Sequence, residues 1–199
     1  MFTLTDQLVN EIEIDGRSYH LNLYFDTVLL FFDLMDDEDF SAPRKIEIAA
    51  DMFIDFGDDV VPFEKKFKAV QAIIETYIKD DEKEEDSQKA SGPRLYDLKQ
   101  DAKYIYASFL QEYQIDLIDQ QGVLRWEKFT ALLSGLRDNT RFKEIVGIRA
   151  AELPPASKSP EERKRLQKLK KLYALDKDQK TREAELDMMF NTLANQGGN

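Results

Sequence analysis

The spacing of apolar residues changes from a period of two to a helical period within the first thirty residues. Residues 11–14 and 17–21 alternate around Asp15-Gly16, a pair that supplies the positive φ angles of a two-residue hairpin turn. A lone hairpin is marginally stable in water, so we expect this one to lie on helices. From Phe25 onward, apolar residues recur every three or four positions. The pattern predicts a mainly α protein, a helical bundle with an N-terminal β-hairpin and a C-terminal extended helix.

Three amphipathic helices are predicted in the first half of the chain. The first begins at Phe25 and ends at the acidic run 36–39. The second follows Ser41, which fits an N-cap, and Gly57 fits its C-terminal stop; the third begins near Pro62. The residues predicted to face inward are Phe25, Val28, Leu29, Phe32 and Met35 in the first helix, Ile46, Ala49, Ala50 and Phe53 in the second, and Phe63, Phe67, Val70, Ile74 and Tyr77 in the third.

The second half of the chain repeats the helical pattern with more aromatic residues. It opens at Leu95, and a turn at Gly122 separates its first two helices. A further helix starts at Ser159-Pro160, where Glu162 is placed to close a capping box. The predicted inward residues are Leu98, Ala102, Ile105, Phe109 and Tyr113, then Trp126, Phe129, Leu133 and Leu136, then Phe142, Ile145 and Ile148, and finally a narrow seam of Leu166, Leu169 and Tyr173.

Composition divides the chain into four consecutive segments. Residues 1–78 are an acidic half made of the hairpin and helices, and residues 79–94 are a polar, mostly charged linker without a large apolar residue. Residues 95–150 are an aromatic-rich helical half, and residues 157–199 are a basic C-terminal helical extension. A segment with the composition of this linker cannot bury enough apolar surface to fold, so we expect it to be solvated and mobile.

Charge is distributed unevenly along the 199 residues. The net charge is −11, but residues 1–92 hold 23 acidic and 9 basic side chains, which leaves a net charge of +3 for the remainder. An acidic body repels a nucleic-acid backbone, so nucleic-acid binding is disfavoured. The basic segment Lys158–Lys171 has three interpretations, namely a solvated helix face, a nucleic-acid contact, or a helix that docks on an acidic neighbour.

The sequence carries no signal for a membrane or for an oxidising compartment. No apolar run approaches the roughly 20 residues that span a bilayer, and the N-terminal residues do not match a signal peptide. The absence of cysteine excludes disulfides and thiolate chemistry. We therefore expect a cytoplasmic protein that does not enter a membrane.

The sequence offers no convergent set of catalytic or metal-binding side chains. His20 is the only histidine and falls in the hairpin, so a catalytic triad or a histidine metal site would rest on it alone. The acidic run 36–39 has no glycine-turned loop around it, and no glycine-rich phosphate loop occurs. We expect no enzymatic activity, no cofactor and no metal.

Two features are candidates for binding a partner protein. Tyr104 lies off the inward stripe of its helix, so its ring is available to another molecule. The second feature is an apolar stripe near the C-terminus, which consists of Leu186, Met189, Phe190 and Leu193. This stripe either reaches another molecule or folds back onto the core of the protein, and the sequence leaves both interpretations open.

An ordered set of residues between positions 96 and 149 is similar to the signature of one phage protein family. The set consists of Tyr96-Asp97, Asp101, Tyr104 to Phe109, Tyr113-x-Ile115-Asp116-Leu117, Leu124-x-Trp126-x-x-Phe129, Ala131 to Leu133, Gly135-Leu136 and Phe142-x-x-Ile145-x-x-Ile148-Arg149. The chain thereby resembles the bacteriophage gene-fifteen protein family of Gram-positive siphophages and prophages, over most of residues 1–150. That family often has two consecutive tryptophans where this chain has Trp126-Glu127.

The resemblance implies a role in tail assembly, since genes of this family lie between those for the major tail protein and the tape-measure protein. It implies a non-enzymatic chaperone that binds the tape-measure protein, the major tail tube protein or both, and we expect a homo-oligomer. Such a protein acts in the cytoplasm of an infected or lysogenic bacterium and is absent from the mature virion. Two alternatives stay open: a structural tail or connector component of the virion, and a helical regulator that binds nucleic acid through residues 158–182.

Overall fold

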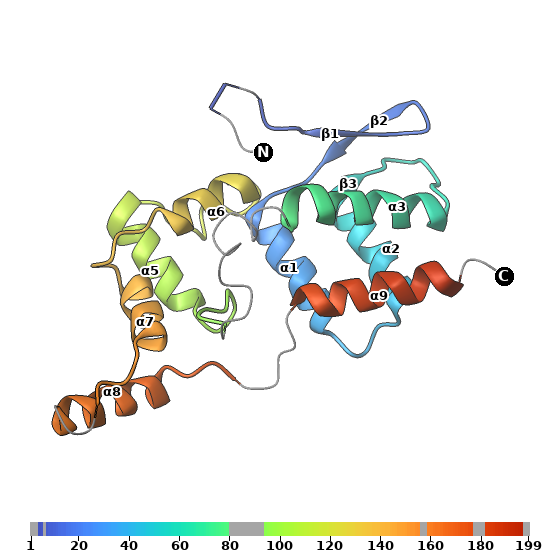
Figure 1. The fold of residues 1–199 in the computed structure, drawn as a ribbon. Helices are drawn as coiled ribbons and strands as arrows, with labels where there is room; N and C mark the ends of the chain where they lie inside the picture. The colour runs from blue at the N-terminus through green and yellow to red at the C-terminus, as the bar shows by residue number, and fades with distance from the viewer. Residues whose placement is uncertain (1–3, 6, 80–93, 156–158, 177–181, 197–199) are drawn as a thin grey trace. The chain divides into compact units, whose positions relative to one another are not determined.

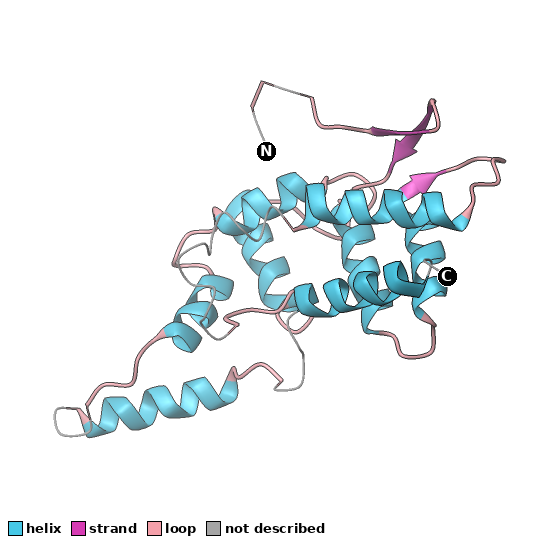
Figure 2. Cartoon of the chain, turned by 45° about the vertical axis from the view of Figure 1, so that its right-hand side comes forward, coloured by secondary structure: helices cyan, strands magenta, loops and turns pink. Residues whose placement is uncertain are grey.

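The chain folds as a mainly α protein with a small sheet near its N-terminus, as predicted (Figures 1 and 2). The computed structural model describes residues 4–5, 7–79, 94–155, 159–176 and 182–196. Two compact units are present: unit 1 comprises residues 1–90, 121–130 and 180–199, and unit 2 comprises residues 91–120 and 131–179. None of the described helices is both long enough and apolar enough to cross a membrane.

The two units differ from the four consecutive segments predicted from composition. Residues 121–130 and helix α9 (Arg182–Gln196) belong with the N-terminal half of the chain. A backbone hydrogen bond of 2.8 Å from the Trp126 amide to the Leu23 carbonyl shows how the first of these segments joins unit 1. Most of the predicted linker, residues 80–93, lies outside the described residues.

The N-terminal sheet contains the predicted hairpin and one further strand. Strands β1 (Glu11–Ile14) and β2 (Arg17–Leu21) pair antiparallel across Asp15 and Gly16. These two residues have φ angles of 55° and 75°, the left-handed geometry that a type I′ turn requires. Strand β3 (Ile54–Asp55) pairs with β2 and completes the order β1-β2-β3. The sequence does not predict β3, because a two-residue strand is too short to show alternation.

The helices of unit 1 begin close to their predicted positions, but one ends early. The helical elements are α1 (Phe25–Asp36), α2 (Ala42–Phe53), α3 (Phe63–Ile73), the π-helical turn η1 (Ile74–Ile78), the start of α6 (Trp126–Ser134) and α9. Ser41 precedes α2 as predicted. The predicted stop at Gly57 is wrong, because the backbone becomes extended at Ile54 to pair with Leu21 in the sheet. Gly57 instead follows β3, with a φ angle of 54°.

Aromatic side chains form the centre of unit 1. The ring of Phe31 lies 5.1 Å from that of Phe53, and the ring of Phe32 meets Trp126 edge-on at 5.9 Å. Among the inward residues predicted for α1 and α2, the buried ones are Phe25, Val28, Phe32, Ile46, Ala49, Ala50 and Phe53, whereas Leu29 and Met35 are half-buried. The predicted stripe omits Phe31, because α1 packs against both α2 and the start of α6 and therefore buries a wider face than one stripe.

Unit 2 is built on the pairing of α5 with α7. Its helices are α5 (Ala102–Tyr113), the end of α6, α7 (Arg141–Ala150) and α8 (Pro160–Leu172). The predicted core residues Ile105, Phe109, Phe142 and Ile145 are buried. Ala102 is exposed, contrary to prediction, because it is the first residue of α5 and follows a turn. Ser159 precedes α8 as predicted, but its side chain makes no capping hydrogen bond, so the predicted capping box is not formed.

A first prediction concerns the aromatic core of unit 1. Replacing Phe31 by Ala should lower the free energy of unfolding by about 3–5 kcal/mol, because the ring is fully buried and its removal leaves a cavity. The matched control is Leu30→Ala on the same helix, where the side chain is 57% exposed and the loss should stay below about 1 kcal/mol. Urea unfolding followed by the fluorescence of Trp126, the only tryptophan and a neighbour of Phe32, measures both. Equal losses would contradict this account of the core.

A hydrogen-bonded ion pair ties the hairpin to the loop before α3. The Arg17 guanidinium donates to both carboxylate oxygens of Asp59 at 2.7 and 2.8 Å, and the Tyr19 hydroxyl donates to the same carboxylate at 2.8 Å. These hydrogen bonds, with that of Arg17 the strongest influence, hold the pKa of Asp59 below its ordinary value of 3.8. A carboxyl with a lowered pKa stabilises the fold above the pKa of the unfolded chain, and this stabilisation is lost as the pH falls through the folded pKa.

The second prediction is that an NMR titration of the Asp59 carboxyl gives a pKa below 3.8. Arg17→Gln should return this pKa toward the ordinary value, because the charged donor is removed. Arg44→Gln is the matched control, since Arg44 pairs with Glu47 and not with Asp59. An unchanged Asp59 titration in Arg17→Gln would show that the ion pair is not formed in solution.

Candidate interaction surfaces

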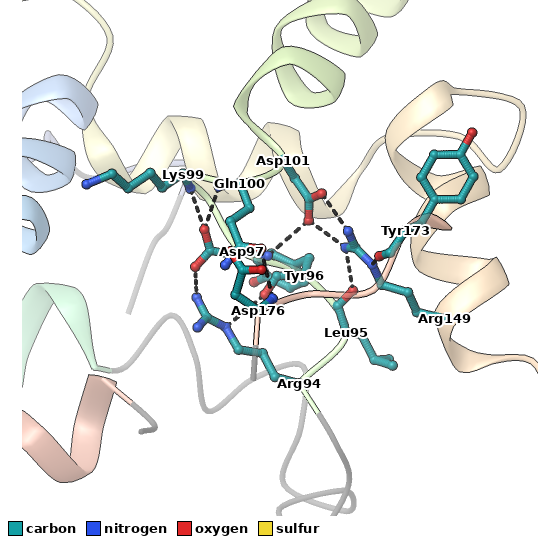
Figure 3. A network of polar contacts seen from close by, with 10 residues as sticks. All are labelled: Arg94, Leu95, Tyr96, Asp97, Lys99, Gln100, Asp101, Arg149, Tyr173 and Asp176. Carbon is teal, nitrogen blue, oxygen red and sulfur yellow. Dashed lines mark hydrogen bonds and ion pairs between the residues drawn. The ribbon is translucent and has the colours of Figure 1, made fainter. Parts of the chain in front are cut away.

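A buried polar network in unit 2 contains Asp97, Asp101 and Arg149, which belong to the family pattern (Figure 3). Arg149, at the end of α7, donates from Nη1 and Nη2 to the two carboxylate oxygens of Asp101 at 2.6 and 2.8 Å. Asp101 is 1% exposed, and only 10% of the Arg149 side chain is exposed. Two parallel hydrogen bonds from a guanidinium to a carboxylate fix both distance and orientation. We call this pair and its hydrogen-bond partners the Arg149 clamp.

A second buried carboxylate, Asp97, shapes the turn that leads into α5. One of its oxygens accepts hydrogen bonds from the backbone amides of Lys99 and Gln100 at 2.9 and 2.6 Å, and the other pairs with Arg94. The Asp97 amide in turn donates to the Asp101 carboxylate at 3.0 Å. Both buried carboxylates are thus occupied by internal donors, which suits them to positioning the chain rather than to acid–base chemistry.

The Arg149 clamp also reaches the end of α8. The Arg149 side chain donates to the carbonyls of Leu95 and Tyr173 at 3.0 and 2.6 Å, and Lys170 donates to the Arg149 carbonyl at 2.6 Å. The Arg141 guanidinium lies 5.3 Å from the centre of the Tyr173 ring and donates to its hydroxyl. The C-terminal end of α8 is therefore attached to α7 and to the segment before α5 by hydrogen bonds.

Two further residues of the family pattern, Tyr113 and Gly135, have structural roles in unit 2. The Tyr113 hydroxyl donates to the Leu132 carbonyl at 2.9 Å. A side chain at Gly135 would place its Cβ 3.2 Å from both that hydroxyl and the Ala131 carbonyl, which is tighter than ordinary packing. Glycine at this position therefore allows the close approach of the tyrosine.

Tyr104, a predicted partner-binding residue, is half-buried beside α8. Its ring meets that of Tyr173 edge-on at 6.2 Å, and the Lys103 ammonium lies 4.8 Å from its centre. Part of the ring is thus used inside unit 2, and a role of Tyr104 in binding another protein stays a prediction.

Helix α8 presents an open basic surface. None of its side chains is buried, and Leu172 is 68% exposed. Six of its thirteen residues are lysine or arginine and two are glutamate. Near its start, Arg163 donates to the Pro154 carbonyl at 2.8 Å. The helix is attached through polar contacts near its ends, and the predicted seam of Leu166, Leu169 and Tyr173 is half-buried rather than buried.

The C-terminal apolar stripe packs on unit 1 in this structure. Leu186 and Phe190 of α9 are 3% and 7% exposed, and the Phe190 ring lies 5.4 Å from that of Phe67 in α3. Asp187 forms an ion pair with Lys79, at the end of η1. Met189 and Leu193, the other members of the stripe, are half-buried. Of the two interpretations left open by the sequence, the structure shows the stripe on the protein's own core.

Unit 1 contains a buried ion pair that the sequence does not suggest. Arg125 and Glu127 have side chains 8% and 10% exposed, and Arg125 donates to Glu127 at 2.8 Å. Arg125 also donates to the Asn10 side chain at 2.6 Å and to the Val9 carbonyl at 3.0 Å, which anchors the segment before β1. Burial, and then the Glu127 charge, raise the pKa of Tyr77 nearby. The sequence gives no signal that this pair is buried, because the segment that Arg125 anchors, Val9 and Asn10, lies 116 and 115 positions away along the chain.

Within the described ranges, no group of three or more His, Asp or Glu side chains is placed to hold a metal ion. His20 lies on β2 and is exposed.

A comparison with protein families matches residues 4–175 to the bacteriophage Gp15 protein model. The chain belongs to the bacteriophage Gp15 protein family. The matched region spans the Arg149 clamp and α8 and ends before α9. This result confirms the family predicted from the resemblance. Neither the curated proteins nor the solved structures gave a match.

The third prediction tests the Arg149 clamp in this Gp15 family member. Arg149→Ala should lower the free energy of unfolding by about 3–5 kcal/mol, because it leaves the buried Asp101 carboxylate without its cation. Arg165→Ala removes the same side chain from an exposed position of α8 and should change stability by no more than about 0.5 kcal/mol. Urea unfolding followed by far-ultraviolet circular dichroism compares the two variants. Equal midpoints would mean that the clamp does not stabilise unit 2.

Proposed function

We propose that this Gp15 family protein is a non-enzymatic chaperone of phage tail assembly that binds the tape-measure protein, the tail tube protein or both. The observation that carries this proposal is α8, a helix of a matched family member that buries no side chain and is held in place by the Arg149 clamp. A helix that is fixed at its end and leaves most of its side chains exposed is suited to lie against a partner. The proposed site of action is the cytoplasm of the host during tail morphogenesis.

The distribution of charge supports a chaperone. Unit 1 holds 27 acidic and 13 basic residues, and unit 2 holds 12 acidic and 15 basic residues. The resulting net charge of −14 keeps unit 1 soluble, and a complex that includes it gains the same protection from aggregation. The basic α8 then supplies an attractive surface for an acidic partner segment. We propose that the same opposite charges favour association between copies of the chain.

A non-enzymatic role agrees with the way the buried carboxylates are used. Asp97 and Asp101 are occupied by arginines and backbone amides, and Glu127 is paired with Arg125. A catalytic carboxylate needs room for a substrate proton within hydrogen-bond reach. These three carboxylates instead hold chain segments together.

A helical regulator of nucleic acid is the second candidate, and the six basic side chains of α8 are the observation that favours it. The net charge of −14 on unit 1 opposes it, because a nucleic-acid backbone is repelled by an acidic surface.

The fourth prediction is that co-expression with the tape-measure protein of the same phage yields a soluble complex of both chains. Size exclusion with light scattering after nuclease treatment gives its mass and removes any bridging nucleic acid. Lys168→Glu with Lys171→Glu on α8 should weaken the complex at least about tenfold, because it reverses two exposed charges of the proposed surface. Lys68→Glu with Lys128→Glu is the matched control on exposed lysines of unit 1 and should leave the complex intact.

Two outcomes would contradict the chaperone proposal. In the first, the tape-measure protein stays insoluble and this chain elutes alone. In the second, mass spectrometry finds the chain in purified virions at the level of a structural subunit, which would identify a tail or connector component. Loss of the complex on nuclease treatment would instead favour the regulator.

A further inference from the structure

The face of unit 1 beneath α9 is an apolar surface already occupied by an amphipathic helix. Phe67 supplies the ring against which Phe190 packs, and Lys79 supplies the cation for Asp187. Leu186 of α9 is also buried. The side of α9 that contacts this face thus carries an apolar residue, an acid and an aromatic residue, at Leu186, Asp187 and Phe190. Another helix that uses the face needs the same three kinds of side chain at the same spacing.

The covering helix and the covered face differ in their relation to the family. Phe67 and Lys79 lie inside the matched region, residues 4–175, whereas α9 lies beyond it. The face thus lies within the region that matches the family, and its cover in this chain lies outside that region.

Electrostatics make α9 a weak cover. It carries three acidic residues and one basic residue, and the rest of unit 1 carries 24 acidic and 12 basic residues. Helix and unit therefore repel each other at long range, except at the Asp187–Lys79 contact. A basic helix with the same three anchoring side chains keeps the apolar contacts and replaces repulsion by attraction.

We propose that α9 is a displaceable cover over a docking face for a basic amphipathic helix of a partner protein. When the partner helix displaces α9, a helix of better electrostatic fit takes its place on the face. Which of the two helices occupies the face depends on the difference between their affinities for it. This inference deepens the proposed function by naming a surface for the partner, and it rests on that function only for the identity of the partner.

The test uses the full chain, whose lack of cysteine allows α9 to be locked in place. In the Lys79→Cys, Asp187→Cys variant, a short bismaleimide joins the two positions that form the ion pair. The matched control is the same variant capped at both cysteines with N-ethylmaleimide. The probe is a fluorescent peptide of residues 182–196 carrying Glu183→Lys and Glu185→Lys, and its anisotropy reports binding. The locked form should bind the probe at least about tenfold more weakly than the capped form, and added salt should weaken binding to the capped form.

A second pair of variants tests the same face without cross-linking. Phe190→Ala removes the ring that packs on Phe67 and should raise the affinity for the probe several-fold, because the cover is weakened. Met188→Ala, on the same helix at a position that is 56% exposed, should leave the affinity unchanged.

The outcomes separate this inference from the proposed function. Equal probe binding by the locked and capped forms, or no binding by either, overturns the docking face. Cross-linked dimers in place of cross-linked monomers overturn it in favour of α9 exchange between copies. Equal probe binding by the two forms, together with capture of the tape-measure protein by both, overturns the docking face and leaves the chaperone role through α8. If the capped form binds the probe but does not capture the tape-measure protein, the chaperone role is overturned and the docking face beneath α9 is supported.

Discussion

The ion pair between Arg149 and Asp101 is the interaction on which the arrangement of unit 2 depends. Two charges withdrawn from water are tolerated only when they pair well and their remaining hydrogen-bonding groups are also satisfied. Here one guanidinium meets this condition by bonding Asp101 and the carbonyls of Leu95 and Tyr173. These acceptors come from segments before α5 and after α8. The hydrogen bonds that the buried Arg149 guanidinium needs therefore hold α7, the segment before α5 and the end of α8 together. The open surface of α8 follows, because the helix is attached by polar contacts near its ends rather than by burial along its length.

Features that depend on neighbouring residues could be predicted from the sequence. The hairpin follows from Asp15-Gly16 between alternating segments, and α2 follows from Ser41 and an apolar stripe that ends at Phe53. Features that depend on distant residues could not. Trp126 fits a core position, but nothing in its own helix shows that this core is in unit 1. The partners Asp101 and Arg149 both belong to the recognised pattern, yet 48 positions separate them and a pattern does not state which acid meets which base.

The same distinction applies to the candidate surfaces. An amphipathic stripe indicates that a helix has an apolar side, but it does not identify the surface that this side meets, which is why the stripe containing Leu186 and Phe190 supported two interpretations. The structure resolves where it lies through a ring contact with Phe67 and an ion pair with Lys79. The uneven charge along the sequence, in contrast, carries over into the folded units, because most charged side chains stay at the surface wherever the chain goes.

The two surfaces differ in what limits their use. Helix α8 buries no side chain, so the proposed binding there would need no rearrangement and its strength would be set by the partner's charge. The face beneath α9 is covered, and any partner affinity is reduced by the fraction of time that the cover is in place. A cover with the same sign of charge as its own unit keeps this reduction small while still shielding Phe67 from other apolar surfaces. A protein that must shield an aggregation-prone chain and later release it benefits from such a balance, because a tightly held cover would prevent capture and an absent one would favour self-aggregation.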